Sequence, residues 1–290
     1  MKIENMITHP EKVFWPDEGY TKMDVARYYE RVFPRLKPYL KDRLLAMERC
    51  PDGMRGGCFY QKEKPKGMPA GTPTKAIEHE KRTVNYVVGG SLETQIALVN
   101  LGCIPVHMWA SRASHPHQPD WVVFDVDPGS GKFSDAAEAG LLVKSALDGI
   151  GLVSFPKTSG SRGLHVFIPL RLNPDYDAVL PFAKNICERL SAEHPKELTV
   201  EQRIEKRKGR VYLDAFRNGF GATVVAPYSI RRRENAPFSM PLAWKDVKPT
   251  LVPAAFNLGN YETYLAAPDP WEDFFDSRQS LSAASVASQR

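Results

Sequence analysis

WVVFDVDPG, residues 121–129, has the pattern of a β-strand that ends in a turn. Because alternate residues of a strand share a face, its apolar residues are expected to face the core. Asp125 and Asp127 then project together from the other face, at the end of the strand. Two carboxylates held this close repel each other unless a cation lies between them, and Mg²⁺ or Mn²⁺ suits such hard oxygen ligands. The stretch therefore predicts a metal site; a simple Asp-Pro-Gly turn is the alternative.

The segment KTSGSRGLHVFIPL, residues 157–170, follows and predicts a glycine-rich turn that leads into a second strand. The backbone N–H groups of the turn that begins at Ser159 can bind phosphate oxygens. Lys157 and Arg162 add positive charge, and His165 can donate to a phosphate or transfer a proton. The segment is a candidate nucleotide-binding site, and a plain hairpin with a hydrogen-bonded histidine is the alternative.

A third carboxylate stands in VYLDAFRN, residues 211–218, where Asp214 interrupts an apolar strand. An ionised carboxylate in such a position needs a partner. With Asp125 and Asp127 it would complete a site in which two metal ions, about 3.5–4 Å apart, clamp the two oxygens of an in-line displacement. Farther on, one of the three arginines of PYSIRRR (227–233) could neutralise a triphosphate, although a solvated basic run is the alternative.

The positive charge of the chain is concentrated at one end. Residues 1–82 hold 17 Lys and Arg against 12 Asp and Glu, whereas the remaining residues hold 22 of each kind. A second basic stretch runs from residue 196 to 233. This distribution favours a polyanionic partner, with a merely solvated basic face as the alternative.

The composition excludes several other classes of protein. The chain has 290 residues, of which 42% are hydrophobic, enough for one large α/β domain or two lobes. No apolar stretch approaches the roughly 20 residues that span a bilayer, and no signal peptide follows Met1, so we expect a cytoplasmic protein without a membrane partner. The four cysteines form no CxxC pair, so we expect reduced thiols rather than a zinc site or disulfides.

Periodicity and turn residues outline the elements. The spacing predicts helices over 21–33, 91–101, 134–150 and 176–192. Thr21 is the expected N-cap of the first helix, with Asp24 as its acidic partner, and Ser134 is the expected N-cap of the third. It predicts strands over 43–49, 82–88, 103–110 and 210–216, with 222–230 extended. Helices and strands mix throughout, which is typical of the α/β (α+β) class. We expect a catalytic domain over 1–276 and a disordered, Ser/Ala-rich tail over 277–290.

The order of these motifs resembles the archaeo-eukaryotic primase superfamily, and within it the polymerase domain of bacterial ligase D and its stand-alone relatives in prokaryotic non-homologous end joining. The resemblance covers roughly residues 8–250. It includes EKVFWPDEGYTKMDVARYYERV (11–32), FDVDPG (124–129), KTSGSRGLHVFIPL and PYSIR. It implies a primase-type catalytic domain of the α/β (α+β) class, with mixed sheets around a central cleft.

The resemblance also implies roles for single residues. Asp125, Asp127 and Asp214 look like the metal-binding, catalytic triad. The resemblance implies that Ser159, His165 and Arg231 contact the triphosphate. It implies that Lys12 and Lys22 bind the 5′-phosphate of a recessed DNA end. Phe59 and Tyr60 are expected to stack where the template bends, and Lys62 is expected to contact the DNA backbone. Two departures from the family pattern imply a weaker phosphate grip: His9 stands where relatives often carry a polar amide, and residues 217–223 (RNGFGAT) lack the extra basic residue that is common in relatives.

The resemblance finally implies an activity. We expect a nucleotidyltransferase with a two-metal Mn²⁺ or Mg²⁺ site that adds nucleotides, preferring ribonucleotides, to a 3′ end during gap filling at double-strand breaks. Some untemplated (terminal transferase) addition is expected, as is a location at the bacterial nucleoid. Because no ligase or nuclease segment is present, we also expect Ku and a separate ATP-dependent DNA ligase as partners. A primase, a non-catalytic module that binds DNA ends and a haloacid-dehalogenase-type phosphatase are the alternatives; the last has Thr or Val where Pro128 stands.

Overall fold

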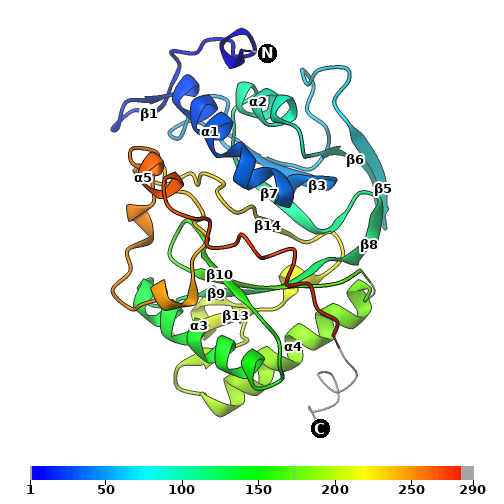
Figure 1. The fold of residues 1–290 in the computed structure, drawn as a ribbon, viewed down its shortest axis with the longest axis vertical. Coiled ribbons are helices and arrows are strands. Elements are labelled where there is room, and N and C mark those ends of the chain that lie inside the picture. Colours follow the sequence, from blue (N-terminus) through cyan, green and yellow to red (C-terminus); the bar gives the residue numbers. More distant parts are fainter. Residues whose placement is uncertain (1, 173, 282–290) are drawn as a thin grey trace. The chain divides into compact units, whose positions relative to one another are not determined.

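The computed structural model describes residues 2–172 and 174–281, which form two compact units. Unit 1 comprises residues 2–114, 223–239 and 254–267, and unit 2 comprises residues 115–172, 174–222, 240–253 and 268–281. Both units combine helices with a β-sheet, as labelled in Figure 1. The α/β class predicted from the sequence is therefore confirmed.

Unit 1 is built on an antiparallel sheet with the strand order β14-β7-β3-β6-β5, and β4 pairs with β3. Its strands are β3 (Arg43–Arg49), β4 (Phe59–Gln61), β5 (Thr74–His79), β6 (Arg82–Val88), β7 (Cys103–Arg112) and β14 (Thr223–Val225). A separate hairpin joins β1 (Val13–Trp15) to β2 (Tyr20–Thr21). The α-helices in the described part of this unit are α1 (Lys22–Leu40), α2 (Leu92–Asn100) and α5 (Tyr261–Leu265).

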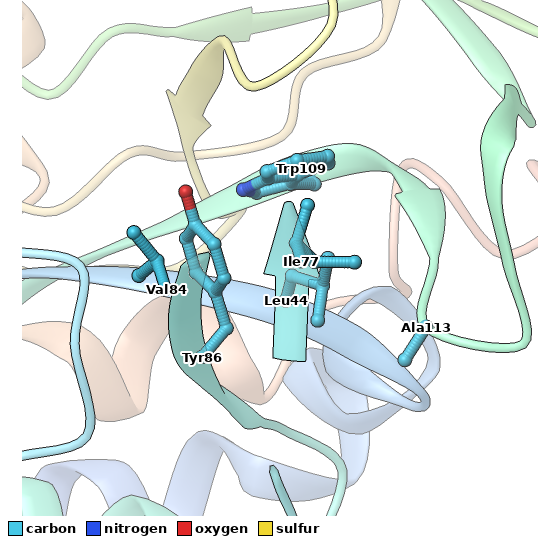
Figure 2. Close-up of a cluster of buried hydrophobic side chains, with 6 residues drawn as sticks. All are labelled: Leu44, Ile77, Val84, Tyr86, Trp109 and Ala113. Carbon is cyan, nitrogen blue, oxygen red and sulfur yellow. The ribbon is translucent and has the colours of Figure 1, made fainter. Parts of the chain in front are cut away.

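The core on one side of this sheet is a mixed aromatic and aliphatic cluster (Figure 2). The indole of Trp109 on β7 meets the ring of Tyr86 on β6 edge to face, with 5.2 Å between the ring centroids. Edge-to-face pairs contribute about 0.5–1.5 kcal/mol beyond the area that they bury. The cluster thus joins β6 and β5 to the middle of the sheet, and its members are Leu44, Ile77, Val84, Tyr86, Trp109 and Ala113.

Helix α1 begins where the sequence predicts and ends later. Thr21 and Asp24 form a reciprocal capping box, with Asp24 N donating to Thr21 Oγ1 over 3.2 Å and Thr21 N to Asp24 Oδ2 over 2.8 Å. The helix then continues through Pro34 and Pro38 to Leu40, although each proline removes a backbone donor. The buried side chains beyond residue 33 supply the packing that offsets this loss.

Unit 2 contains a five-stranded sheet with the order β10-β11-β9-β13-β12. Its strands are β9 (Trp121–Asp127), β10 (Phe155–Thr158), β11 (Leu164–Pro169), β12 (Leu198–Thr199) and β13 (Val211–Asp214), and all neighbours are antiparallel except β12 and β13. Strand β8 (His115–Pro119) precedes them. The sheet therefore places β9, which carries the first two aspartates, at its centre.

Two helices of unit 2, α3 (Phe133–Asp148) and α4 (Tyr176–Glu193), pack on the same side of this sheet (Figure 1). Gly140 permits the close approach of α3, because a Cβ at this position would lie 2.3 Å from the side chain of Leu164 on β11. The helices cover the apolar face of β9, so its carboxylates lie on the opposite face.

Three local expectations are wrong. Helix α3 has Lys132 rather than Ser134 at its N-cap, because the Ser134 hydroxyl donates to Asp135 instead. Residues 222–230 are not extended throughout, since β14 ends at Val225 and Tyr228 takes a φ of +62°. Residues 115–119, for which the sequence predicts no strand, form β8.

The prediction of reduced thiols is correct for two cysteines and wrong for two. Cys103 and Cys187 are free and buried. Cys50 and Cys58 form a disulfide, because the turn between them folds the chain back until their Cα atoms are 4.4 Å apart. No sequence motif marks this pair, which is separated by a turn rather than by a CxxC spacing.

The end of the described chain is tied to unit 2. Gln279 N donates to Pro169 O over 3.1 Å, and Arg171 N donates to Gln279 O over 2.9 Å. The rest of the tail predicted from the sequence, residues 282–290, lies outside the described residues. None of the helices in the described part of the chain has the length and apolar content to cross a membrane.

Candidate active site

The register of the unit 2 sheet places four sequence-predicted residues in one row. Asp125 on β9 pairs with His165 on β11 and with Asp214 on β13, and His165 pairs with Lys157 on β10. Paired residues of neighbouring strands share a face. Lys157, His165, Asp125 and Asp214 therefore form a continuous row across four strands, and Asp127 occupies the next position on that face of β9.

Asp125 lies between a histidine and an arginine. His165 Nε2 is 3.2 Å from Asp125 Oδ1, and Arg217 Nε is 3.3 Å from Asp125 Oδ2. Burial alone would raise the pKa of Asp125, but the interactions with His165, Arg217 and Lys157 outweigh it and hold the pKa well below its usual range. Asp125 is thus ionised, as a ligand for a cation must be.

Asp214 shares Arg217 with Asp125. Arg217 Nε is 3.3 Å from Asp214 Oδ2, and Phe216 N donates to Asp214 Oδ1 over 2.8 Å. Burial and then the charge of Asp125 raise the pKa of Asp214, although Arg217 acts in the opposite direction. The two carboxylates therefore repel each other, and Arg217 is the cation that bridges them.

Asp127 is paired with Arg207, a residue that the sequence analysis missed. Arg207 Nη1 lies 3.0 Å from Asp127 Oδ2, and its guanidinium carbon lies 3.9 Å above the ring of Tyr212. Two main-chain oxygens, those of Glu201 and Gln202, hold the same guanidinium. Arg207 stands in a loop without periodicity, so the only signal in the sequence was the general basic character of the segment.

The turn after β10 is organised by its own serine. Ser159 Oγ accepts hydrogen bonds from Ser161 N over 3.2 Å and from Gly163 N over 3.1 Å. A Cβ on Gly163 would lie 2.5 Å from Val126 O, so the turn packs directly on the end of β9. Arg162 lies beside the turn that follows β9, where a Cβ on Gly131 would be 3.2 Å from its Nη1. The predicted phosphate turn and the predicted carboxylate site are thus neighbours.

Lys157 is completely buried, and its Nζ lies 2.8 Å from His165 Nδ1. An ammonium group can only donate, so Nδ1 accepts and a neutral ring carries its proton on Nε2, which faces Asp125. The observed contact of Lys157 is therefore with the histidine, whereas the sequence suggested a phosphate contact.

The residues predicted to bind DNA all lie in unit 1. Lys22 is buried, and its Nζ donates to Thr8 O over 2.7 Å and to Asn100 O over 3.0 Å. Burial, followed by the charge of Lys12, lowers the pKa of Lys22. Lys12 in turn pairs with Asp52 over 2.8 Å. Lys22 is therefore within electrostatic range of Lys12.

The aromatic pair on β4 is exposed. Phe59 and Tyr60 have relative exposures of 47% and 67%, which is high for side chains of this size. The guanidinium of Arg49 lies 5.4 Å from the centroid of Phe59. Lys62 follows on the same segment and is exposed. Arg231 is half-buried, and the neighbouring Arg232 pairs with Glu48 over 2.9 Å.

The donor set of unit 2 fits a divalent cation in kind. Three carboxylates, those of Asp125, Asp127 and Asp214, gather on one face, and two guanidinium groups supply the positive charge that they require. Across residues 2–172 and 174–281, however, no three histidine, cysteine or carboxylate side chains converge as a ready metal site. Arg217 and Arg207 instead lie against one oxygen of each carboxylate.

The model of the primase-polymerase domain of LigD matches residues 21–271. The chain belongs to this family. A primase-polymerase is a nucleotidyltransferase, so the chain is an enzyme of that class.

Individual LigD proteins agree with this assignment. The multifunctional non-homologous end joining protein LigD of Pseudomonas aeruginosa is 30% identical over 96% of this chain, and the bifunctional LigD of Bacillus subtilis is 29% identical over 97%. The chain spans 34% and 46%, respectively, of the length of these two relatives.

A solved structure shows the same fold. The polymerase domain of Mycobacterium tuberculosis ligase D, in complex with DNA, superposes with a TM-score of 0.86 at 27% identity, covering 93% of this chain and 97% of that chain. This similarity confirms the primase-type fold that the sequence predicts for this chain.

Proposed function

We propose that this chain is a metal-dependent DNA end-joining polymerase that adds nucleotides to a 3′ end during gap filling at double-strand breaks. One observation carries the proposal: Asp125 and Asp214 face each other in register on neighbouring strands, and Asp127 follows on the same face. Three carboxylates in this arrangement are the ligand set of a nucleotidyl-transferring site.

The residues around the triad have separate roles in this proposal. Divalent metal ions, when bound to Asp125, Asp127 and Asp214, would lower the pKa of the primer 3′-hydroxyl and neutralise the triphosphate. His165 presents Nε2–H toward the same site, because Lys157 occupies Nδ1. In unit 2, the Ser159 turn and Arg162 are proposed to bind the phosphates of the incoming nucleotide. In unit 1, Arg231 is proposed as a phosphate-binding residue.

Unit 1 supplies the residues proposed to hold the DNA. Lys12 and Lys22 carry the two ammonium groups proposed to bind a 5′-phosphate. Phe59 and Tyr60 offer exposed rings for unstacked bases, where stacking contributes about 1–3 kcal/mol per base. Lys62 adds a contact to the backbone of the strand. These roles are supported by the exposure of the rings and by the electrostatic effect of Lys12 on Lys22.

Further properties follow from the same proposal. We expect Mn²⁺ or Mg²⁺ as the cofactor, ribonucleotides as the preferred substrate and some untemplated addition. The names of the relatives refer to non-homologous end joining, which supports broken DNA ends as the substrate. Ku and a separate ATP-dependent DNA ligase as partners, and the nucleoid as the site of action, belong to the same proposal.

Primer extension tests the proposal. The substrates are a gapped duplex with or without a downstream 5′-phosphate, supplied with Mn²⁺ or Mg²⁺ and with rNTPs or dNTPs. The expected result is extension that the 5′-phosphate stimulates and that Asp214→Asn abolishes, whereas Asp177→Asn, an exposed change on α4 of the same unit, leaves it intact.

Two outcomes would contradict it. Absence of extension by the native protein, with DNA binding intact, would favour a module that only binds ends. Synthesis of new strands on an unprimed template, without any response to the 5′-phosphate, would favour a primase.

A further inference from the structure

Two adjacent tyrosines in the middle of α1, Tyr28 and Tyr29, are completely buried, and both hydroxyl groups reach the segment 228–230. This segment immediately precedes Arg231 in the chain. All of these residues belong to unit 1.

The first tyrosine holds a backbone conformation that is rare outside glycine. Tyr28 Oη donates to Tyr228 O over 2.6 Å, and Tyr228 has a φ of +62°. Bulky residues rarely adopt positive φ, and they keep it only where the surroundings enforce it. On its other side, Tyr228 N donates to Ser239 O over 2.7 Å. Tyr228 is therefore fixed from both sides.

The second tyrosine completes the hydrogen bonding of the next residues. Tyr29 Oη donates to Ile104 O over 2.9 Å, accepts from Ile230 N over 3.2 Å and lies 3.3 Å from Ser229 Oγ. Ser229 Oγ also accepts from Val106 N over 2.8 Å. One phenol hydroxyl thus links α1, β7 and the segment before Arg231.

The geometry of the segment explains why the hydroxyl is needed. Arg231 N donates to Pro237 O over 2.7 Å, and Ser239 N donates to Ser229 O over 3.0 Å. In such an antiparallel pairing the backbone groups of alternate residues point to opposite sides. Ile230 N therefore points away from residues 237–239 and toward α1, where Tyr29 Oη is its acceptor. A phenylalanine would fill the same space without providing this acceptor.

The positive charge of Arg231 also acts on the hydroxyl group of Tyr29. Burial raises the pKa of Tyr29, and the positive charge of Arg231 is among the groups that act in the opposite direction. Burial likewise raises the pKa of Tyr28 well above its usual value. Both hydroxyls accordingly remain protonated, so both remain available as donors at any pH at which the protein is used.

We propose that Tyr28 and Tyr29 are positioning residues that hold Arg231 in place to bind the phosphates of the incoming nucleotide. The inference rests on the proposed function, since it takes from it the role of Arg231. It adds the residues that fix the arginine, and it assigns to the centre of α1 a part in nucleotide binding.

Steady-state kinetics of extension, with the nucleotide concentration varied, tests the inference. Tyr28→Phe and Tyr29→Phe should each raise KM for the nucleotide about five- to tenfold, because an unpaired buried backbone group displaces the segment, while kcat and the Kd for gapped DNA change less than about twofold. The matched control is Tyr86→Phe, which removes a hydroxyl that lies 2.9 Å from His79 Nε2 in the same unit. Circular dichroism checks that each variant is folded.

A double-mutant cycle separates positioning from general loosening of the core. Arg231→Ala should raise KM for the nucleotide, and adding Tyr29→Phe to it should have no further effect. The inference would be overturned if Tyr29→Phe raised KM by the same factor in the native protein and in Arg231→Ala. It would also be overturned if Tyr28→Phe and Tyr29→Phe gave the same KM as Tyr86→Phe.

The cycle also separates this inference from the proposed function. If Arg231→Ala leaves KM unchanged while the native protein extends primers, the role of Arg231 is wrong and the inference fails with it, but the polymerase stands. If the native protein does not extend primers at all, the proposed function itself has failed.

Discussion

Asn218 provides the sharpest quantitative prediction for the site. Its side chain is completely buried; Oδ1 accepts from Val123 N over 2.8 Å, and Nδ2 donates to Val123 O over 2.7 Å and to Ala215 O over 2.9 Å. Strand β13 ends at Asp214, opposite Asp125, so the amide takes over the backbone groups of β9 that β13 no longer pairs. Asn218 thus anchors the strand beside the carboxylate row.

Asn218→Asp keeps the shape but removes both hydrogens of Nδ2. Two carbonyl groups then face a carboxylate oxygen instead of a donor, inside a fully buried site. Loss of two hydrogen bonds and burial of a charge should together lower the free energy of unfolding by about 3–5 kcal/mol at pH 7.

The effect of this substitution should depend on pH. Burial and the facing carbonyl oxygens raise the folded-state pKa of the new carboxyl above its unfolded value of about 3.9. Below that value the carboxyl is protonated in both states, and its O–H can donate to one carbonyl. As the pH rises above about 4, the free energy of unfolding should fall relative to the native protein by about 1.4 kcal/mol per pH unit, until the folded-state pKa is reached.

Urea unfolding followed by circular dichroism from pH 4 to pH 8 measures this difference. Asn5→Asp, on the exposed first turn of the described chain, is the matched control and should leave the stability unchanged. A stability for Asn218→Asp within about 0.5 kcal/mol of the native protein at pH 7, or a difference that does not grow with pH, would refute the reasoning.

Three further predictions concern the proposed activity. Asp125→Ala should lower the rate of primer extension at least about 10³-fold while DNA binding, measured by fluorescence anisotropy, is retained; more than a tenth of the native rate would contradict this. Gly163→Ala should lower kcat/KM about 100-fold, because its Cβ would lie 2.5 Å from Val126 O and force β9 and β11 apart. The control is Gly149→Ala, whose Cβ would make contacts of 3.4 Å or more. Equal kinetics of the two variants would exclude this steric cause. Lys22→Met should reduce the affinity for a 5′-phosphorylated gap to that for a 5′-hydroxyl gap, and a preference that persists would remove this lysine from the phosphate site.

The sequence predicts single elements of the site well, because their patterns are local. Alternation in WVVFDVDPG places Asp125 and Asp127 on one face of β9, and the structure has them there. The apolar neighbours of Asp214 likewise predict β13. Periodicity does not say which strands pair, however, so the row that joins Asp125 to Asp214 and His165 became visible only in the structure.

Residues that act from irregular segments escape sequence reasoning. Arg207 pairs with Asp127 from a loop whose position depends on main-chain contacts with Glu201 and Gln202. The contact of Tyr29 with Ile230 joins residues that are about two hundred positions apart. Nothing in the local pattern of either segment marks such a contact, because tertiary packing alone creates it.

The row across β10, β11, β9 and β13 also sets an order of assembly during synthesis of the chain. The hairpin of β10 and β11 joins residues that are close in sequence, so it can pair with β9 as soon as the segment up to residue 170 has left the ribosome. The other edge of β9 must wait for β13, more than forty residues later. Until then the nascent chain exposes an apolar strand edge together with two adjacent carboxylates. We therefore expect ribosome-bound chains that stop before Val211 to bind chaperones more strongly than chains that extend past Asn218.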